Sequence, residues 1–93
     1  MKVTVEVSFS FKSELDDNPV TIDLAEGADV MTALRALARL QPQVSSRIFG
    51  PSDEVMPYIN VLKNGGNVRF QRGFATQLQD GDCLTLIPPV GGG

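Results

Sequence analysis

The sequence predicts an α+β domain in which a five-stranded mixed sheet packs on one main helix. Three observations predict it. Apolar and polar residues alternate near the N-terminus, apolar residues then recur with helical spacing, and the C-terminal half holds a hairpin signal followed by another alternating run. Elements in the order β, β, α, β, β, β bury these apolar faces most simply as a sheet on a helix. A chain of 93 residues is long enough for one such core.

The first predicted strand covers residues 3–11. Its apolar side chains alternate with threonine, glutamate and serine, and they are Val3, Val5, Val7, Phe9 and Phe11. A period of two is typical of a strand with one buried face. Residues 12–19 are polar and rich in turn formers, and residues 20–24 alternate again. We therefore expect the two runs to form a hairpin.

One amphipathic helix is predicted after Asp29, the expected N-cap. The apolar residues have the spacing i, i+3, i+4, i+7 and i+8, and they are Val30, Ala33, Leu34, Leu37 and Ala38. Arg35 and Arg39 fall on the opposite face. Because Pro42 cannot continue the pattern, the helix should end by about Leu40. Residues 43–57 predict only a short helical turn and a loop.

A second hairpin is predicted in the C-terminal half. Residues 58–63 and 67–70 read as strands, and they flank Asn64, Gly65 and Gly66. Asparagine and glycine tolerate the positive φ that tight hairpin turns require. We therefore expect these residues to form the turn.

The last predicted strand is residues 83–87. A short turn is expected within residues 73–79, and the sequence Asp-Gly-Asp at 80–82 then leads into the strand. Pro88 and Pro89 end it, because proline supplies no N–H to a ladder.

The composition restricts the chemistry of this chain. Cysteine occurs once and histidine not at all, which excludes an intramolecular disulfide, a Cys/His metal cage and histidine acid–base catalysis. We predict no catalytic residue, no metal site and no bound cofactor. The net charge of −3 argues against nucleic acid and suits a basic partner surface. The chain has neither the apolar run of a signal peptide nor one of roughly 20 residues that could span a membrane, so we expect a cytoplasmic protein without a membrane partner.

The chain ends in a segment without charged side chains: Pro88, Pro89, Val90, Gly91, Gly92 and Gly93. Ordering a residue costs roughly 1 to 2 kcal/mol, and glycine has no side chain to offset it. We therefore expect a folded domain over residues 1–87 and a flexible tail over residues 88–93. Glycines without Cβ atoms can enter a narrow channel of a partner and present the Gly93 carboxylate there. Taken alone, a terminal glycine run also fits an expression scar or a frayed end.

The C-terminal third, residues 68–93, resembles the ubiquitin-like MoaD/ThiS sulfur carriers. The elements of the family pattern are present as Asn64-Gly65, Asp80-Gly81-Asp82, Pro88-Pro89-Val90 and Gly92-Gly93. The resemblance covers essentially the full chain, is weakest over residues 43–57, and implies a β-grasp fold. Gly91 is one glycine more than the pattern has. The working pair is therefore Gly92-Gly93 or, shifted by one position, Gly91-Gly92.

The resemblance implies that an E1-like enzyme adenylates Gly93 and that this enzyme, not the carrier, binds the ATP. The product would be converted to a thiocarboxylate that donates sulfur in molybdopterin or cysteine biosynthesis, with a synthase large subunit or a cysteine synthase as acceptor. The chain is more similar to the molybdopterin-synthase small subunit and the cysteine-synthesis carriers than to the shorter thiamine carrier. The alternative is a protein modifier joined through Gly93 to target lysines. A noncovalent adaptor would leave the tail without a role.

Residues next to the glycines are further candidates. The resemblance makes Gly91 and Gly92 the part of the tail that threads into the partner, and the residues before them are expected to bind it: Ile87, Pro88, Pro89 and Val90. Apolar side chains at the base of a tail can dock on the partner while the glycines enter its site. Ile87 can instead pack under the hairpin.

The remaining candidates have a simpler interpretation. Cys83 lies out of phase with Leu84 and Leu86 and close to acidic residues, which indicates an ordinary strand residue. Three cations follow one another along the predicted second hairpin, namely Lys63, Arg69 and Arg72. They fit a solvated hairpin, or they face carboxylates of a partner.

Overall fold

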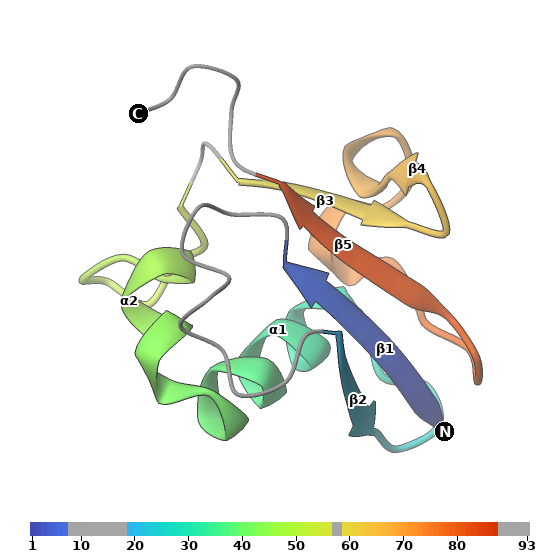
Figure 1. Ribbon diagram of the computed structural model, residues 1–93. Coiled ribbons are helices and arrows are strands. Elements are labelled where there is room, and N and C mark those ends of the chain that lie inside the picture. The colour runs from blue at the N-terminus through green and yellow to red at the C-terminus, as the bar shows by residue number, and fades with distance from the viewer. Residues whose placement is uncertain (8–18, 57–58, 88–93) are drawn as a thin grey trace.

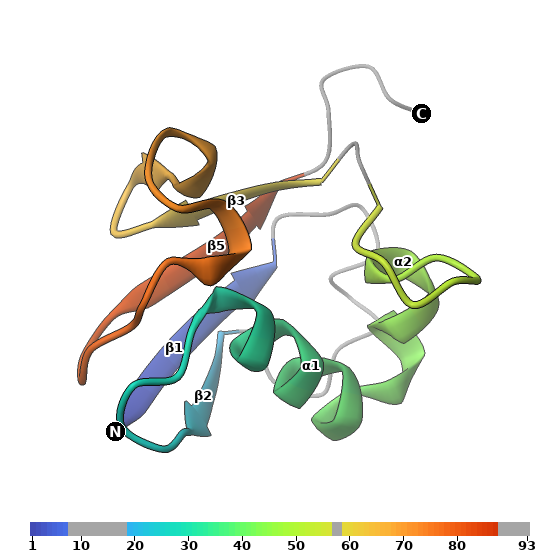
Figure 2. The same cartoon turned by 180° about the vertical axis from the view of Figure 1, so that it is seen from behind.

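A mixed sheet packed against one main helix forms the fold (Figures 1 and 2). The computed structural model describes residues 1–7, 19–56 and 59–87. The strands are β1 (Lys2–Val7), β2 (Val20–Asp23), β3 (Asn60–Lys63), β4 (Gly66–Asn67) and β5 (Cys83–Ile87). Their order in the sheet is β2-β1-β5-β3-β4, with β1 and β5 parallel and all other neighbours antiparallel. This arrangement confirms the predicted five-stranded β-grasp architecture.

The N-terminal hairpin is confirmed where the structure describes it. β1 pairs with β2 so that Val3 lies opposite Ile22 and Val5 opposite Val20, and all four side chains are buried. The part of the predicted first strand that contains Phe9 and Phe11 lies outside the described residues. In the β1–β2 hairpin, valines and one isoleucine thus form the face of the sheet that points to the core, and they alternate with polar residues.

Helix α1 (Val30–Leu40) begins and ends where the sequence predicts. The Asp29 carboxylate accepts hydrogen bonds from the backbone N–H of Thr32 at 2.9 Å and from its hydroxyl at 2.8 Å, which caps the first turn. The predicted apolar face points at the sheet, with Ala38 half-buried at its margin and the others buried.

The weakly predicted segment after the helix contains two short turns, η2 (Pro42–Val44) and α2 (Ser45–Ile48). They confirm the short helical turn. The loop that follows is held on α1 by Arg35, whose guanidinium lies 2.6 Å from the Asp53 carboxylate and 5.2 Å from the centre of the Phe49 ring. The Asp53 side chain is 71% exposed and that of Arg35 is 41% exposed, so the ion pair contributes at most about 1 kcal/mol.

The second hairpin turns where expected, but its second strand is much shorter than predicted. Asn64 has φ 49° and Gly65 φ 90°, the two positive values of a type I′ turn. β4 ends at Asn67, and residues 68–70 form the 3-10 turn η3 (Val68–Phe70) instead of a strand. The Asn67 side chain causes the change, because its Oδ1 accepts from the Arg69 N–H at 3.0 Å and caps the turn.

The core fixes β5 in the middle of the sheet. Leu84 and Leu86 have no exposed surface, and they pack with Leu34 and Leu37 of α1. Burying one such side chain contributes about 1.5 to 3 kcal/mol. A second predicted turn, η4 (Gly73–Ala75), and the Asp-Gly-Asp sequence that leads into β5 are both confirmed. The last described residue of the chain therefore ends a strand that is paired on both sides.

Candidate functional site

The candidate site is the end of β5, from which the predicted tail continues. Ile87 is the last residue of the strand and pairs with Asn60 of β3. Two residues earlier, Thr85 lies between Glu6 of β1 and Leu62 of β3. Residues 88–93, which include the predicted reactive and partner-binding positions after Ile87, lie outside the described residues. The structure therefore places the base of the tail at the rim of a firmly held sheet.

The site faces away from the helix. Cys83, Thr85 and Ile87 alternate along β5 with the two buried leucines, so they lie on the face of the sheet opposite α1. Leu62 and Asn60 share this open face through their pairing with β5. All five are partly exposed. The predicted phase of the strand is confirmed, and Ile87 lies at the open face next to the point where the tail begins.

Cys83 occupies an ordinary strand position near the opposite end of β5. Its backbone N–H donates to the Asn64 side-chain oxygen at 2.9 Å. The preceding residue, Asp82, is 8% exposed, and its carboxylate accepts from the Asn64 amide at 3.0 Å and from the Gln79 N–H at 2.7 Å. A reactive thiol needs nearby positive charge to stabilise its thiolate form. The adjacent buried carboxylate of Asp82 provides negative charge instead.

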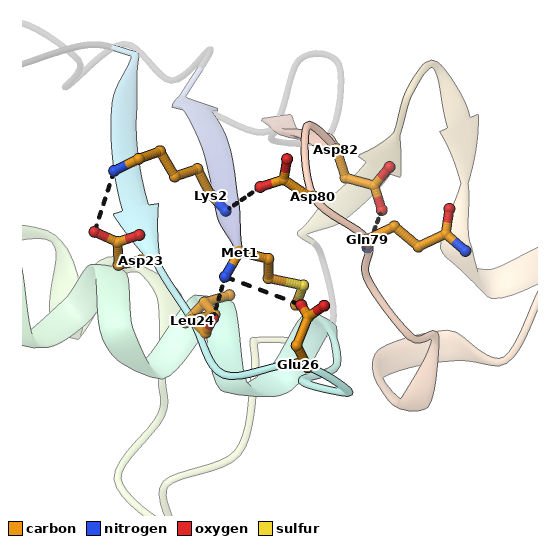
Figure 3. A network of polar contacts seen from close by, with 8 residues as sticks. All are labelled: Met1, Lys2, Asp23, Leu24, Glu26, Gln79, Asp80 and Asp82. Carbon is orange, nitrogen blue, oxygen red and sulfur yellow. Dashed lines mark hydrogen bonds and ion pairs between the residues drawn. The ribbon is translucent and has the colours of Figure 1, made fainter.

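A polar network ties down the end of the sheet where β1 and β5 begin (Figure 3). The Lys2 N–H donates to the Asp80 carboxylate at 2.7 Å, and the Met1 amino group donates to the Leu24 carbonyl at 2.8 Å. Lys2 also forms an ion pair with Asp23 at 3.3 Å. Because β1 and β5 are parallel, this network lies at the end of the sheet remote from Ile87. The end of β5 that carries the tail is free of it.

A pocket of about 160 Å³ opens beside the start of β3. It exists because β4 pairs, within the described residues, with Leu62 and Lys63 but not with Asn60 or Val61. Turn η3 then carries Arg69 to the rim of the gap, and apolar side chains line it from several segments: Val55, Met56, Ile59, Val61, Val68 and Phe74. This pocket was not predicted from the sequence. The available signal was Asn67, whose side chain can accept a hydrogen bond from the backbone N–H two residues later.

Two of the three cations singled out from the sequence, Arg69 and Arg72, flank an exposed aromatic residue along the chain. Lys63 donates to the Gln77 carbonyl at 3.3 Å, whereas Arg69 and Arg72 are exposed on either side of Phe70. Phe70 itself is 84% exposed. Neither arginine forms an ion pair with another described side chain. The structure thus turns the predicted hairpin strand into a projecting basic loop.

No cluster of three or more histidine, cysteine, aspartate or glutamate side chains that could hold a metal ion occurs among residues 1–7, 19–56 and 59–87. Within the same ranges, every helix is too short or too polar to cross a membrane.

Comparison with known proteins gives consistent matches over nearly the full chain. The profile of the ThiS family matches residues 9–93. Small archaeal modifier protein 3 of Haloferax volcanii is 32% identical over 93 residues, which is 100% of both chains. A putative sulfur carrier protein of Archaeoglobus fulgidus is 28% identical over 81 residues, 87% of this chain and 91% of the relative. The crystal structure of SAMP1 from Haloferax volcanii superposes with a TM-score of 0.88 at 31% identity and covers 100% of both chains.

Proposed function

This chain belongs to the ThiS family, and we propose that it is a ubiquitin-like sulfur carrier whose C-terminal glycine is the reactive group. Two of its relatives are named a small archaeal modifier protein and a putative sulfur carrier protein. In this proposal an E1-like enzyme adenylates the carboxylate of Gly93, and a sulfur donor converts it to a thiocarboxylate. The sulfur then passes to an acceptor enzyme that makes molybdopterin or cysteine. The chain itself binds no cofactor, because ATP belongs to the activating enzyme.

The observation that carries the proposal is the position of Ile87, the residue before the predicted tail, at the end of the central strand. β5 is paired with β1 and β3 and buries Leu84 and Leu86 against the helix. A partner that docks on the open face around Ile87 therefore has a fixed starting point for the six residues that follow. Placing a reacting group to within about 1 Å matters, since such an error can cost about a hundredfold in rate.

The proposed chemistry needs no catalytic side chain on this protein. A carboxylate oxygen of Gly93 attacks the α-phosphorus of ATP, and pyrophosphate leaves. Hydrosulfide, supplied by a sulfur donor, attacks the carbonyl carbon, AMP leaves and a proton is released, so that the thiocarboxylate remains. Gly91 and Gly92 thread into the enzyme, where the absence of Cβ atoms lets the backbone pass a narrow channel. Ile87, Pro88, Pro89 and Val90 form the partner contact at its mouth.

A covalent modifier is the second candidate, and a specific observation favours it. A relative that matches over the whole chain is named small archaeal modifier protein 3. The same adenylate would then react with a lysine amine of a target protein, AMP would leave, and an isopeptide bond would form. Carrier and modifier share the activation step, and they differ only in the nucleophile.

Truncation of the tail tests the activation step that both candidates share. Full-length protein, the form without Gly93, and the form without Gly92 and Gly93 are compared in ATP–pyrophosphate exchange with the E1-like enzyme of the same organism. Removing two residues shifts the carboxylate by roughly 6 to 7 Å. We expect the double truncation to abolish exchange while the free energy of unfolding changes by no more than about 0.5 kcal/mol, as for a surface change. Full exchange by the doubly truncated protein would refute the proposal, and full exchange after loss of Gly93 alone would assign the function to Gly91-Gly92.

A further inference from the structure

We propose that Arg69, Phe70 and Arg72, here called the Phe70 loop, and the pocket beside Asn60 together form a second docking surface for the activating enzyme. The matching surface of the enzyme carries one apolar side chain and flanking carboxylates. This inference rests on the proposed function, because it concerns the enzyme that takes the tail. It adds a recognition element on the edge of the sheet, separate from the open face around Ile87.

The exposure of Phe70 is the first observation. Its side chain is 84% exposed, the highest value among the large apolar residues that the structure describes, and the other exposed one, Leu40, is at 57%. The neighbouring Val68 of the same turn is only 3% exposed. The turn thus buries one of its apolar residues and leaves the other in solvent. Buried aromatic anchors dominate the binding energy of protein interfaces, so an exposed one beside a pocket is a candidate anchor.

The pocket specifies what can enter it. Its volume is about 160 Å³, and most of its lining residues are apolar. A cavity of about 150 Å³ with an apolar lining holds one benzene molecule. The pocket therefore fits a single large apolar side chain. Asn60, Asn67 and Arg69 supply the polar part of its rim.

The charge at this place selects an acidic partner. The chain carries a net charge of −3, yet Arg69 and Arg72 flank Phe70 without an ion pair to any other described side chain. Arg69 is at the rim of the apolar pocket, and Arg72 lines a wider, shallow hollow that Lys63 also borders. Guanidinium groups pair with carboxylates in two-pronged geometry. A partner loop with an apolar tip and acidic flanks is complementary to this surface.

The pocket is connected to the base of the tail by a short series of contacts. Ile87 pairs with Asn60, and the Asn60 side-chain oxygen accepts from the Asn67 amide at 3.4 Å. Asn67 in turn accepts from the Arg69 N–H at 3.0 Å. An enzyme that covers Ile87 in order to receive the tail therefore reaches the pocket one strand further along the sheet. This proximity is why we assign the surface to the tail-activating enzyme.

The test is the dependence of ATP–pyrophosphate exchange on the concentration of the carrier, measured with the E1-like enzyme of the same organism. Phe70→Ser should raise KM about thirtyfold with unchanged kcat, the fold-change that corresponds to a hot-spot loss of about 2 kcal/mol. The double variant Arg69→Glu, Arg72→Glu should raise KM and weaken the salt dependence of binding. Both changes affect exposed side chains, so thermal unfolding should match that of the wild type.

Matched controls use the other end of the molecule. Leu40→Ser removes the second exposed apolar side chain, and Arg39→Glu reverses an exposed charge of α1. Both controls should keep the wild-type KM. An unchanged KM for Phe70→Ser, or an equal rise for Leu40→Ser, would overturn the docking surface while wild-type exchange leaves the proposed function standing. Absence of exchange with the wild-type chain would instead overturn the proposed function, and the docking inference with it.

Discussion

The side-chain amide of Asn64 donates to the carboxylate of Asp82 at 3.0 Å and links the hairpin turn to the residue before β5. The same amide group, through its oxygen, accepts from the Cys83 N–H at 2.9 Å, and the Asn64 N–H donates to the Cys83 carbonyl at 2.8 Å. Asp82 also accepts from the Gln79 N–H at 2.7 Å. The hairpin turn at Asn64 and the turn before β5, which are separate in the sequence, are therefore linked by hydrogen bonds where β5 begins.

Replacing Asp82 should destabilise the fold. Asp82→Ala leaves the Asn64 amide and the Gln79 N–H without their acceptor, and hydrogen bonds to a charged group contribute about 1.5 to 3 kcal/mol each. Because Asn64 and Gln79 are exposed residues, their freed donors can bind water, and we expect a net loss of about 2 kcal/mol in the free energy of unfolding by urea. The control Asp80→Ala removes an exposed bond from the Lys2 N–H and should cost clearly less. Equal losses of stability for the two variants would contradict the proposed role of Asp82 in linking the two turns.

The type I′ turn gives a second stability prediction. Gly65 has φ 90°, and a Cβ added there would meet nothing within 4 Å, so Gly65→Ala tests backbone conformation without a clash. We expect a loss of about 1 kcal/mol. Gly66→Ala is the matched control. The φ of Gly66 is not in the positive range, and the atom nearest to an added Cβ would be the flexible end of the Gln71 side chain at 3.3 Å. Chemical denaturation measures the free energy of unfolding of both variants. A loss for Gly66→Ala as large as that for Gly65→Ala would count against the backbone conformation of Gly65 as the cause.

Cys83 should be dispensable for loading of the tail. Its thiol lies on the open face, and its nearest charged neighbour in sequence is the buried Asp82, which does not stabilise a thiolate. Cys83→Ala should therefore keep the wild-type rate of ATP-dependent thiocarboxylate formation, measured by intact mass. A folded Cys83→Ala protein that cannot be loaded would show that the thiol takes part. Thermal unfolding of the variant provides the check that it is folded.

Carrier and modifier can be separated in cells. A carrier should be found mainly free, with sulfur in place of one terminal oxygen by intact mass. A modifier should leave Gly-Gly remnants on lysines of many other proteins, and these should vanish when the gene is deleted. Mass spectrometry of extracts from both strains measures the two outcomes together. Abundant gene-dependent remnants would decide against a carrier role alone.

Much of the fold was predictable because its signals are local. The alternation of Val3, Val5 and Val7, the Asp29 cap and the positive-φ pair Asn64-Gly65 each indicate their element within a few residues. The predicted strand over residues 67–70 was wrong beyond Asn67, because residues 68–70 form turn η3. An alternating pattern cannot show that the Asn67 side chain will cap a turn, and local hydrogen bonds of this kind compete with strand pairing. The pocket at Asn60 follows from that same competition, so sequence reasoning missed both.

The sequence by itself determined the element types and the buried faces of α1 and β5, since these depend on residue types at short spacing. Its resemblance to a known family supplied the expectation that Gly93 carries the chemistry. Only the tertiary structure decided that β5 is the central strand, that Ile87 lies beside Asn60, and that Phe70 projects between two arginines. The first two of these relationships join residues far apart along the chain. They depend on which strands pair and where pairing stops, which is settled by burial and hydrogen bonding of the whole sheet rather than by any short stretch of sequence.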